Sequence, residues 1–229
     1  MSKEKNTTES WNQHWQNPAT IKRFKKINIA YPEVTRVLLN LTNEDSKCLE
    51  LGCGSGTYSI ELLANKRNCL ASDFSQRALE LTKIKGKQLY NLDITTQLIN
   101  IYDIPHPDNT FDLVFSDGLL EHLNIQKALE EMKRVLKPQG WMVIKVPSGS
   151  LLYKIVYYLL SPIENRPYEA WLPKKEWQKK FEEQGYRDVA ISCCGGILTG
   201  LAMRLPIIKK FVRFIPSLGK IYFIIKARK

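Results

Sequence analysis

The amino-acid sequence predicts an α/β fold in which a mostly parallel β-sheet carries helices on both faces. Short apolar segments that fit buried strands alternate with amphipathic helical segments from residue 48 to residue 146, and this alternation is typical of a parallel sheet. A glycine-rich turn, Gly52–Gly56, joins the first of these strands to the first of these helices. The chain has 229 residues, enough for one sizeable core, and contains no internal repeat or low-complexity linker. We therefore predict one domain, residues 1–229.

The first predicted elements precede the sheet. In the polar segment Ser10–Asn17, Trp11 and Trp15 stand four residues apart and would share one face of a helix. We interpret residues 1–31 as an N-terminal flap, and the sequence leaves open whether this flap only docks on the domain or forms a lid over a ligand. The proline that opens Pro32–Leu41 and the apolar spacing behind it predict an amphipathic helix there.

Five strands and three helices follow in alternation. Their apolar residues recur either in short continuous runs or at helical spacing. We predict strands at Cys48–Leu51, Asn68–Asp73, Thr95–Ile101, Phe111–Ser116 and Trp141–Val146. We predict helices at Thr57–Asn65, from an N-cap at Ser75 through Ile84, and at Ile125–Lys137, which Pro138 and Gly140 should end.

The pattern becomes less regular after the fifth strand. We predict a helix at Lys174–Gln184 and two further strands at Tyr186–Cys193 and Lys220–Ala227. About two dozen residues separate these two strands, far more than a hairpin needs. We therefore interpret residues 148–173 and 195–218 as lid-like insertions.

Two features at the ends of the first two strands predict a ligand site. The turn Gly52–Gly56 leaves free amides at a helix start, which suits an anionic group, and its glycines tolerate positive φ. Asp73 ends the second strand about 20 residues beyond the first glycine, where an acid can bind both hydroxyls of a ribose. The glycine spacing is G-x-G-x-G, which differs from the G-x-G-x-x-G of dinucleotide enzymes.

Further motifs extend this pattern. Residues 103–116, which read DIPHPDNTFDLVFS, and residues 119–123, which read LLEHL, accompany the glycine loop and Asp73. Together these stretches resemble the class I S-adenosylmethionine-dependent methyltransferases, and more narrowly the small-molecule branch that includes ubiquinone and menaquinone methyltransferases (methyltransferase type 11). The resemblance is strong from about residue 46 to residue 146. It implies a Rossmann-like, seven-stranded sheet that ends in an antiparallel strand pair, with S-adenosylmethionine as cofactor and residues 46–146 as the cofactor-binding core.

The resemblance also implies which residues hold the cofactor. Amides of the glycine loop would face its methionine part, Glu50 would help to bind its amino group, and Asp73 would accept from the ribose hydroxyls. The alternative for Asp73 is an acid at a helix N-terminus. Phe74 would lie against the adenine, and the alternative for it is a core aromatic. Asn100 stands where the family commonly has an acid, and it retains an acceptor oxygen for the adenine amino group. The predicted cofactor contacts are Glu50, Gly52, Cys53, Gly54, Gly56, Asp73, Phe74, Asn100, Ile101, Ser116 and Asp117.

His122 is the candidate for a general base. It follows the fourth strand at the carboxyl edge of the sheet, and an unperturbed imidazole titrates near neutrality. The alternative is a histidine that orders its loop through Glu121. Asp117 should line the same cleft, where it could bind the cofactor's amino group or a cationic substrate. Some relatives hold a metal with an acid-x-x-Glu-His array, but Gly118 occupies the position of that acid, so we predict no metal.

The sequence favours a small or lipid-like acceptor over nucleic acid. It lacks the Asp/Asn-Pro-Pro-Tyr and Pro-Cys motifs of base-modifying methyltransferases and shows no stacking platform of a known RNA-binding type. We predict methyl transfer by in-line displacement to an oxygen or an activated carbon. The alternative is a non-catalytic protein that binds the cofactor and acts through a partner or a membrane.

Charge and cysteine content bear on partners and location. The net charge is +11, and no acid follows Gly195. In Ile207–Ile215 the apolar and basic residues would fall on opposite faces of a short helix, which fits either an anionic membrane contact through residues 197–216 or a lid above the acceptor. The chain has five cysteines, an odd number, and shows no signal peptide and no apolar run of bilayer length. We therefore predict a cytoplasmic protein, which would be peripheral on the membrane if residues 197–216 bind it.

Overall fold

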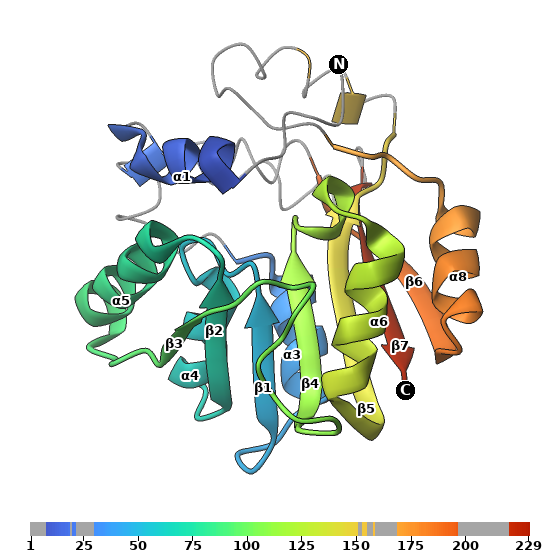
Figure 1. Cartoon of the computed structure of the whole chain (residues 1–229), viewed down its shortest axis with the longest axis horizontal. Helices are drawn as coiled ribbons and strands as arrows, with labels where there is room; N and C mark the ends of the chain where they lie inside the picture. Colours follow the sequence, from blue (N-terminus) through green and yellow to red (C-terminus); the bar gives the residue numbers. More distant parts are fainter. Residues whose placement is uncertain are drawn as a thin grey trace, which may run out of the picture.

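The computed structural model describes residues 8–18, 20–21, 30–150, 153–154, 158, 169–196 and 220–229. Its elements are built around one seven-stranded sheet with the order β3-β2-β1-β4-β5-β7-β6 (Figure 1). β1 to β5 run parallel, and β7 runs antiparallel to both β5 and β6. The strands are β1 (Lys47–Leu51), β2 (Asn68–Asp73), β3 (Thr96–Leu98), β4 (Phe111–Asp117), β5 (Leu136–Pro147), β6 (Arg187–Gly196) and β7 (Lys220–Arg228). The predicted mostly parallel sheet with its antiparallel pair is confirmed.

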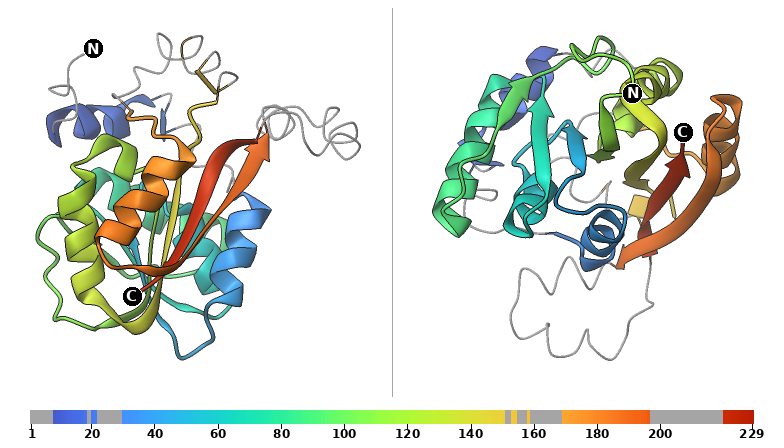
Figure 2. Two further views of the ribbon diagram at one scale, coloured as in Figure 1. Left: turned by 90° about the vertical axis from the view of Figure 1, so that its right-hand side faces the viewer. Right: turned by 90° about the horizontal axis from the view of Figure 1, so that it is seen from below.

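Helices cover both faces of this sheet (Figure 2). They are α1 (Thr8–Gln16), α3 (Pro32–Asn40), α4 (Thr57–Ala64), α5 (Gln76–Tyr90), the 3₁₀-helix η2 (Leu120–His122), α6 (Ile125–Val135) and α8 (Lys174–Glu183). α3, α4 and α5 pack on one face, and α6 and α8 pack on the other. α1 contacts α5 at the edge where the parallel strands end (Figure 1). The loops that follow the parallel strands therefore meet beside α1.

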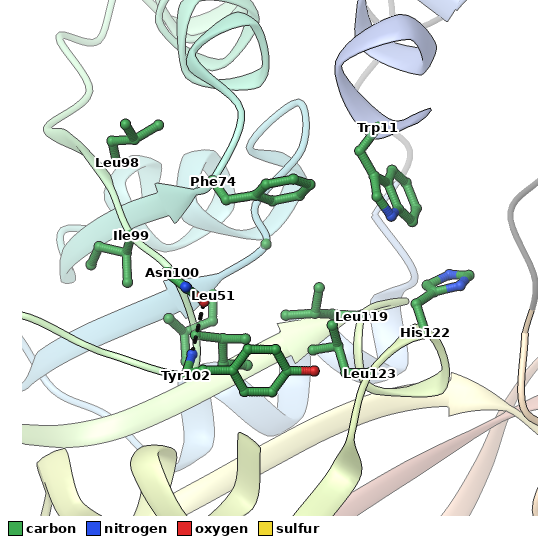
Figure 3. A pocket seen from close by; sticks show the side chains of 12 residues that line it. Trp11, Leu51, Phe74, Leu98, Ile99, Asn100, Tyr102, Leu119, His122 and Leu123 are labelled. Carbon is green, nitrogen blue, oxygen red and sulfur yellow. Dashed lines mark hydrogen bonds between the residues drawn. The ribbon is translucent and has the colours of Figure 1, made fainter. Parts of the chain in front are cut away.

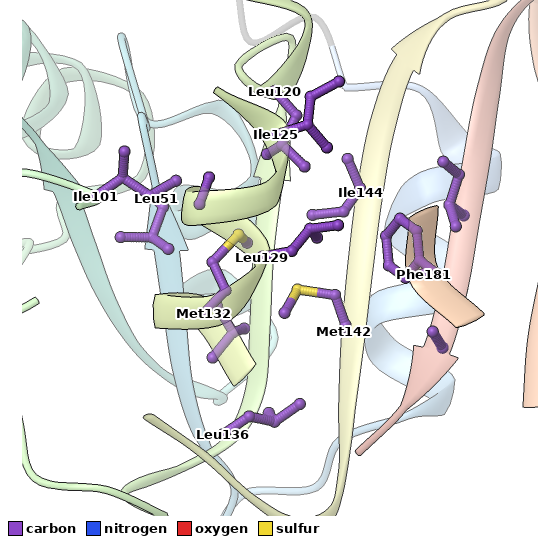
Figure 4. Close-up of a cluster of buried hydrophobic side chains, with 14 of the residues drawn as sticks. Leu51, Ile101, Leu120, Ile125, Leu129, Met132, Leu136, Met142, Ile144 and Phe181 are labelled. Carbon is purple, nitrogen blue, oxygen red and sulfur yellow. The ribbon is translucent and has the colours of Figure 1, made fainter. Parts of the chain in front are cut away.

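The largest hydrophobic cluster lies between the sheet and the pair α6 and α8 (Figure 4). α6 buries an apolar stripe at helical spacing, as the sequence predicts for an amphipathic helix. The stripe consists of Ile125, Ala128, Leu129, Met132 and Val135. Met142 and Ile144 of β5 meet this stripe, and Phe181 of α8 packs on the same cluster. Burial of each large side chain contributes roughly 1.5–3 kcal/mol, which fixes the strands that carry the site.

One predicted boundary is wrong between α6 and β5. α6 ends at Val135 and β5 begins at Leu136, so Pro138 lies within the strand segment and does not end the helix. Leu136 pairs with Phe111 at the start of β4, and Lys229 Nζ donates to the Leu136 carbonyl at 2.7 Å. The pairing of Leu136 with Phe111 therefore begins the strand two residues before the proline.

β3 is shorter than predicted, since it covers Thr96–Leu98 and the expected strand covered Thr95–Ile101. The Asn100 side-chain oxygen accepts from Tyr102 N at 3.0 Å, and Asp103 N donates to the Asn100 carbonyl at 3.0 Å. Such local bonds from an asparagine favour a turn over a strand. The turn ends the strand and places residues 98–102 at the edge of the sheet.

Some predicted features lie outside the described residues. These are the basic helix Ile207–Ile215, the membrane contact at residues 197–216 and most of the insertion 148–173. In the ranges that the structure does describe, no helix combines the length and the apolar character needed to cross a bilayer.

Candidate functional site

Two adjoining cavities lie at the carboxyl edge of the sheet, and four residues line both of them. The first, which we call the apolar compartment, has a volume of about 500 Å³ (Figure 3). Its lining residues are Trp11, Leu51, Gly52, Phe74, Leu98, Ile99, Asn100, Ile101, Tyr102, Leu119, His122 and Leu123. The second, which we call the polar compartment, has a volume of about 180 Å³. Its lining residues are Trp11, Trp15, Glu50, Gly52, Cys53, Gly54, Ser55, Thr57, Tyr58, Asp73, Phe74, Asp117, Gly118 and Leu119.

The glycine loop between β1 and α4 has a backbone that glycine adopts without strain. φ is +66° at Gly52, +54° at Gly54 and +69° at Gly56. A Cβ atom at Gly54 would lie 2.7 Å from the ring of Trp15, and one at Gly56 would lie 2.3 Å from Thr82. The glycines therefore let the loop pack against α1 and α5 while Gly52 and Gly54 line the polar compartment.

Asp73 and the glycine loop share one crevice. Gly54 N donates to one carboxylate oxygen of Asp73 at 2.9 Å, and Ser75 N donates to the other at 2.9 Å. Burial raises the pKa of Asp73, and these backbone hydrogen bonds act in the opposite direction. Asp73 thus anchors the loop and accepts from Ser75, the residue that precedes α5. Each oxygen keeps a lone pair for a ligand, and ribose binding stays a prediction.

Glu50 is buried in the polar compartment with Ser59 as its partner. Ser59 N donates to Glu50 Oε2 at 2.9 Å, and the Ser59 hydroxyl donates to the same oxygen. Burial raises the pKa of Glu50 to about 8, although the bonds from Ser59 lower it. Glu50 therefore lies in the compartment where the sequence predicts the cofactor's amino group, and that contact remains a prediction.

Asp117 carries a charge that the protein itself balances. Lys145 of β5 is its register partner, and Lys145 Nζ donates to Asp117 Oδ1. The same nitrogen lies 4.1 Å from the ring centroid of Tyr222 and 5.0 Å from that of Tyr31. This pairing disfavours Asp117 as a lone site for a cationic substrate. Sequence analysis missed Lys145, although one lysine inside the apolar strand Trp141–Val146 was a visible signal.

The apolar compartment holds the residues that were expected near the adenine and the candidate base. Phe74, Asn100 and Ile101 line it, and the Asn100 oxygen keeps one lone pair beside its bond from Tyr102 N. His122 lines it as well, with its ring edge-on to Trp11 at 5.0 Å between centroids (Figure 3). A helix of the predicted flap therefore forms part of the wall next to the candidate base.

Two predicted contacts line neither compartment. Gly56 precedes α4 in a left-handed conformation, and Ser116 is buried on the face of β4 opposite to Asp117. Conversely, Ser55 and Thr57 line the polar compartment and were missed, although hydroxyls inside a glycine loop were an available signal. The leucines of the apolar compartment gave no signal, because an apolar wall residue looks like a core residue in the sequence. No three metal-ligating side chains come together in the described ranges.

The two compartments fit the two ends of S-adenosylmethionine. Adenine is flat and largely apolar, whereas the methionine end carries an ammonium and a carboxylate group. Phe74 lines both compartments and its neighbour Asp73 lines the polar one, so the pair stands at the boundary where a ribose would lie. The polar compartment offers hydroxyls and carboxylates to the charged end. The prediction of free loop amides is wrong at three positions, because Cys53 N donates to the Ser72 carbonyl, Gly54 N to Asp73 and Gly56 N to the Cys53 carbonyl.

Comparisons with known proteins support S-adenosylmethionine as the cofactor. A family model described as a methyltransferase domain matches residues 49–144. An uncharacterised protein of Methanocaldococcus jannaschii is 30% identical over 162 residues, which cover 70% of this chain and 64% of that protein. The demethylmenaquinone methyltransferase of Staphylococcus epidermidis is 28% identical over 177 residues, which cover 66% of this chain and 73% of that enzyme.

A solved structure of similar fold is that of an S-adenosylmethionine-dependent methyltransferase from Archaeoglobus fulgidus. It aligns with a TM-score of 0.66 over 91% of this chain and 97% of that chain, at 18% sequence identity. The chain thus spans nearly the whole of that structure and less than two thirds of the archaeal relative's length. The family match covers the glycine loop, Asp73 and His122. The matching domain, the relatives and the fold together support a class I S-adenosylmethionine-dependent methyltransferase.

Proposed function

We propose that the chain transfers the methyl group of S-adenosylmethionine to an uncharged, apolar small molecule, at an oxygen or an activated carbon. With adenine against Phe74 and Asn100, the acceptor would occupy the rest of the apolar compartment, beside Trp11, Leu119 and His122 (Figure 3). The observation that carries this proposal is the described lining of that compartment, which contains no Asp, Glu, Lys or Arg. A charged acceptor would lose its hydration there without gaining a partner of opposite charge. The relatives named demethylmenaquinone methyltransferases support an acceptor of this class.

The residues would act chiefly by binding and alignment. Bound S-adenosylmethionine supplies a methyl group that is already activated, and alignment of two reactants can contribute on the order of 7–11 kcal/mol. Asp73 would hold the ribose hydroxyls and Glu50 the amino group. His122, which lines the apolar compartment beside Trp11, would accept the proton of an acceptor hydroxyl.

Binding and transfer are tested in that order on the full chain. Titration calorimetry should show binding of S-adenosylmethionine and of its demethylated product, S-adenosylhomocysteine. Methyl-labelled cofactor should then label a quinol or a hydroxyarene and leave primary amines and RNA unlabelled. Absence of binding would overturn the proposal, and labelling of amines alone would contradict the acceptor class. Binding without transfer to any acceptor would favour the non-catalytic alternative.

We also propose that residues 197–216 extend the acceptor side, either as a lid or as a contact with an anionic membrane. Four basic residues and no acid among apolar neighbours in this segment support both versions. They are Arg204, Lys209, Lys210 and Arg213. Co-sedimentation with anionic vesicles that weakens with added salt would support the membrane version. Equal recovery in the supernatant with and without vesicles would leave the lid version.

A further inference from the structure

Lys85 of α5 is a buried cation directly behind the glycine loop. Only 1% of its surface is exposed, although lysine is rarely buried without a charged partner. Its Nζ atom lies 3.2 Å from the hydroxyl oxygen of Ser55 and 3.2 Å from that of Thr57. These two residues flank Gly56, and both line the polar compartment. The ammonium group is therefore separated from the compartment by only two hydroxyl groups.

The direction of these hydrogen bonds follows from the chemistry of an ammonium group. Lysine can only donate, so the oxygens of Ser55 and Thr57 must accept. The hydroxyl proton of Ser55 then points away from Lys85. Among the described residues, no other side chain forms a hydrogen bond with Ser55. The lysine thus turns the Ser55 hydroxyl into a donor that is available to a ligand in the polar compartment.

The protein does not neutralise this cation at close range. In the described part of the chain, no carboxylate forms an ion pair with Lys85 Nζ, and the nearby acid Glu50 is hydrogen-bonded to Ser59. Burial lowers the pKa of Lys85 to about 8, while Glu50 and Glu61 act to raise it. A buried cation whose partners are two neutral hydroxyls is costly unless an anion lies nearby.

We propose that Lys85 is a positioning residue for the carboxylate group of the cofactor's methionine part and acts through the hydroxyls of Ser55 and Thr57. This inference rests on the proposed function, with the methionine part of the cofactor in the polar compartment. Lys85 would add a positive charge beside the start of α4, where a helix N-terminus favours an anion and where Ser59 N already donates to Glu50. A purely structural role, in which Lys85 only fastens α5 to the loop, predicts no preference for one part of the cofactor.

The two roles separate when binding of two ligands is compared. S-adenosylhomocysteine contains the amino-acid end, whereas 5′-methylthioadenosine keeps the adenosine and lacks that end. In Lys85→Met, we expect S-adenosylhomocysteine to bind roughly tenfold more weakly or worse, because a charge about two hydrogen bonds away is lost from a buried site. Binding of 5′-methylthioadenosine should change less than about twofold, since Lys85 does not reach the apolar compartment.

Matched variants control for folding and for net charge. Lys83→Met removes one positive charge from an exposed position of the same helix and should leave both affinities unchanged. Ser55→Ala keeps the lysine and removes the hydroxyl link, so it should weaken S-adenosylhomocysteine selectively even if Lys85→Met does not fold. Urea unfolding of each variant shows which proteins are folded for the titrations.

The outcomes distinguish this inference from the proposed function. A selective loss for S-adenosylhomocysteine in Lys85→Met or Ser55→Ala supports the role of Lys85. Equal losses for both ligands, or unchanged affinities in both folded variants, would overturn it while leaving the proposed function intact. Failure of the unmodified protein to bind either ligand would instead refute the proposed function.

Discussion

The polar and apolar compartments adjoin each other but are held together by different forces. The polar compartment is built mainly from residues 50–73, where backbone amides of the loop and of α4 bind the buried acids Glu50 and Asp73. The apolar compartment combines α1, residues 98–102 and residues 119–123, which are far apart in the sequence and meet by packing. Hydrogen bonds therefore define the polar compartment, whereas packing of distant segments defines the apolar compartment.

Substitution of His122 should have the largest effect and should act on the apolar compartment alone. If His122 removes a proton from the acceptor, His122→Ala should lower the turnover rate by roughly 10²–10⁴-fold. The affinity for S-adenosylhomocysteine should stay within about twofold, because His122 lies beside Trp11, across the apolar compartment from Asn100 and Ile101 (Figure 3). Single-turnover kinetics and calorimetry measure the two quantities. Unchanged turnover would remove His122 from the mechanism and leave it a wall residue.

Substitution of Asp73 tests the polar compartment. Asp73→Ala leaves the amides of Gly54 and Ser75 without their acceptor, and we expect cofactor affinity to fall about a hundredfold. Stability should fall by roughly 2–4 kcal/mol, since two buried donors lose their partner. Calorimetry and urea unfolding measure both. Asp93→Ala is the control, because Asp93 is exposed and pairs only at the surface with Lys87. Wild-type affinity in a folded Asp73→Ala protein would contradict the ribose contact.

Phe74 lines both the polar and the apolar compartment, so its substitution can be compared with that of Lys85, which affects the polar compartment alone. Phe74→Ala should weaken S-adenosylhomocysteine and 5′-methylthioadenosine equally, by roughly tenfold, because it removes an aromatic surface from the adenosine end. The ratio of the two affinities should therefore stay constant. A change in the ratio would show that Phe74 serves the amino-acid end instead.

The smallest expected effect is a pH dependence of the stability that Glu131 contributes. Arg134 donates two hydrogen bonds to Glu131, which lowers the pKa of Glu131, and Ile104 N donates to the same carboxylate. Because the pKa of Glu131 is lower in the folded protein than its ordinary value of 4.5, the ionised carboxylate stabilises the fold at pH values above 4.5. This stabilisation is lost as the pH falls from 4.5 through the folded-state pKa. Between pH 6 and pH 3 the wild type should therefore lose roughly 2–4 °C more in Tm than Glu131→Gln. Parallel curves of Tm against pH for the two proteins would show that the pairing of Arg134 with Glu131 contributes no stability.

The sequence was most informative where a single short segment forms a structural feature by itself. The strand, the glycine turn, the helix and Asp73 lie within 26 residues, Cys48–Asp73, and local rules of turn and strand formation suffice to predict their crevice. The order of the remaining strands and helices followed from apolar periodicity in the same way. These parts depend on neighbours in the sequence.

The features that the sequence did not predict depend on residues that are close in space but far apart in the chain. Nothing local shows that Leu136 pairs with Phe111 before Pro138, or that Lys145 meets Asp117 across two strands. Lys85 looks like one more lysine of an exposed helix until the fold places it behind Ser55. The contact of Trp11 with His122 likewise requires α1 to lie on the carboxyl edge.

The position of β7 has a consequence for the order of assembly. β6 precedes β7 in the chain but reaches the sheet only through β7, which lies between β5 and β6. The backbone pairing of β6 therefore requires residues 220–228 to have joined β5, whereas α8 also packs on α6 and the Tyr186 hydroxyl donates to the Leu129 carbonyl. The parallel strands can form earlier, because each pairs with a partner that does not need β7. The cofactor crevice, whose described lining includes no residue of β6 or β7, therefore does not require these last two strands to pair with each other.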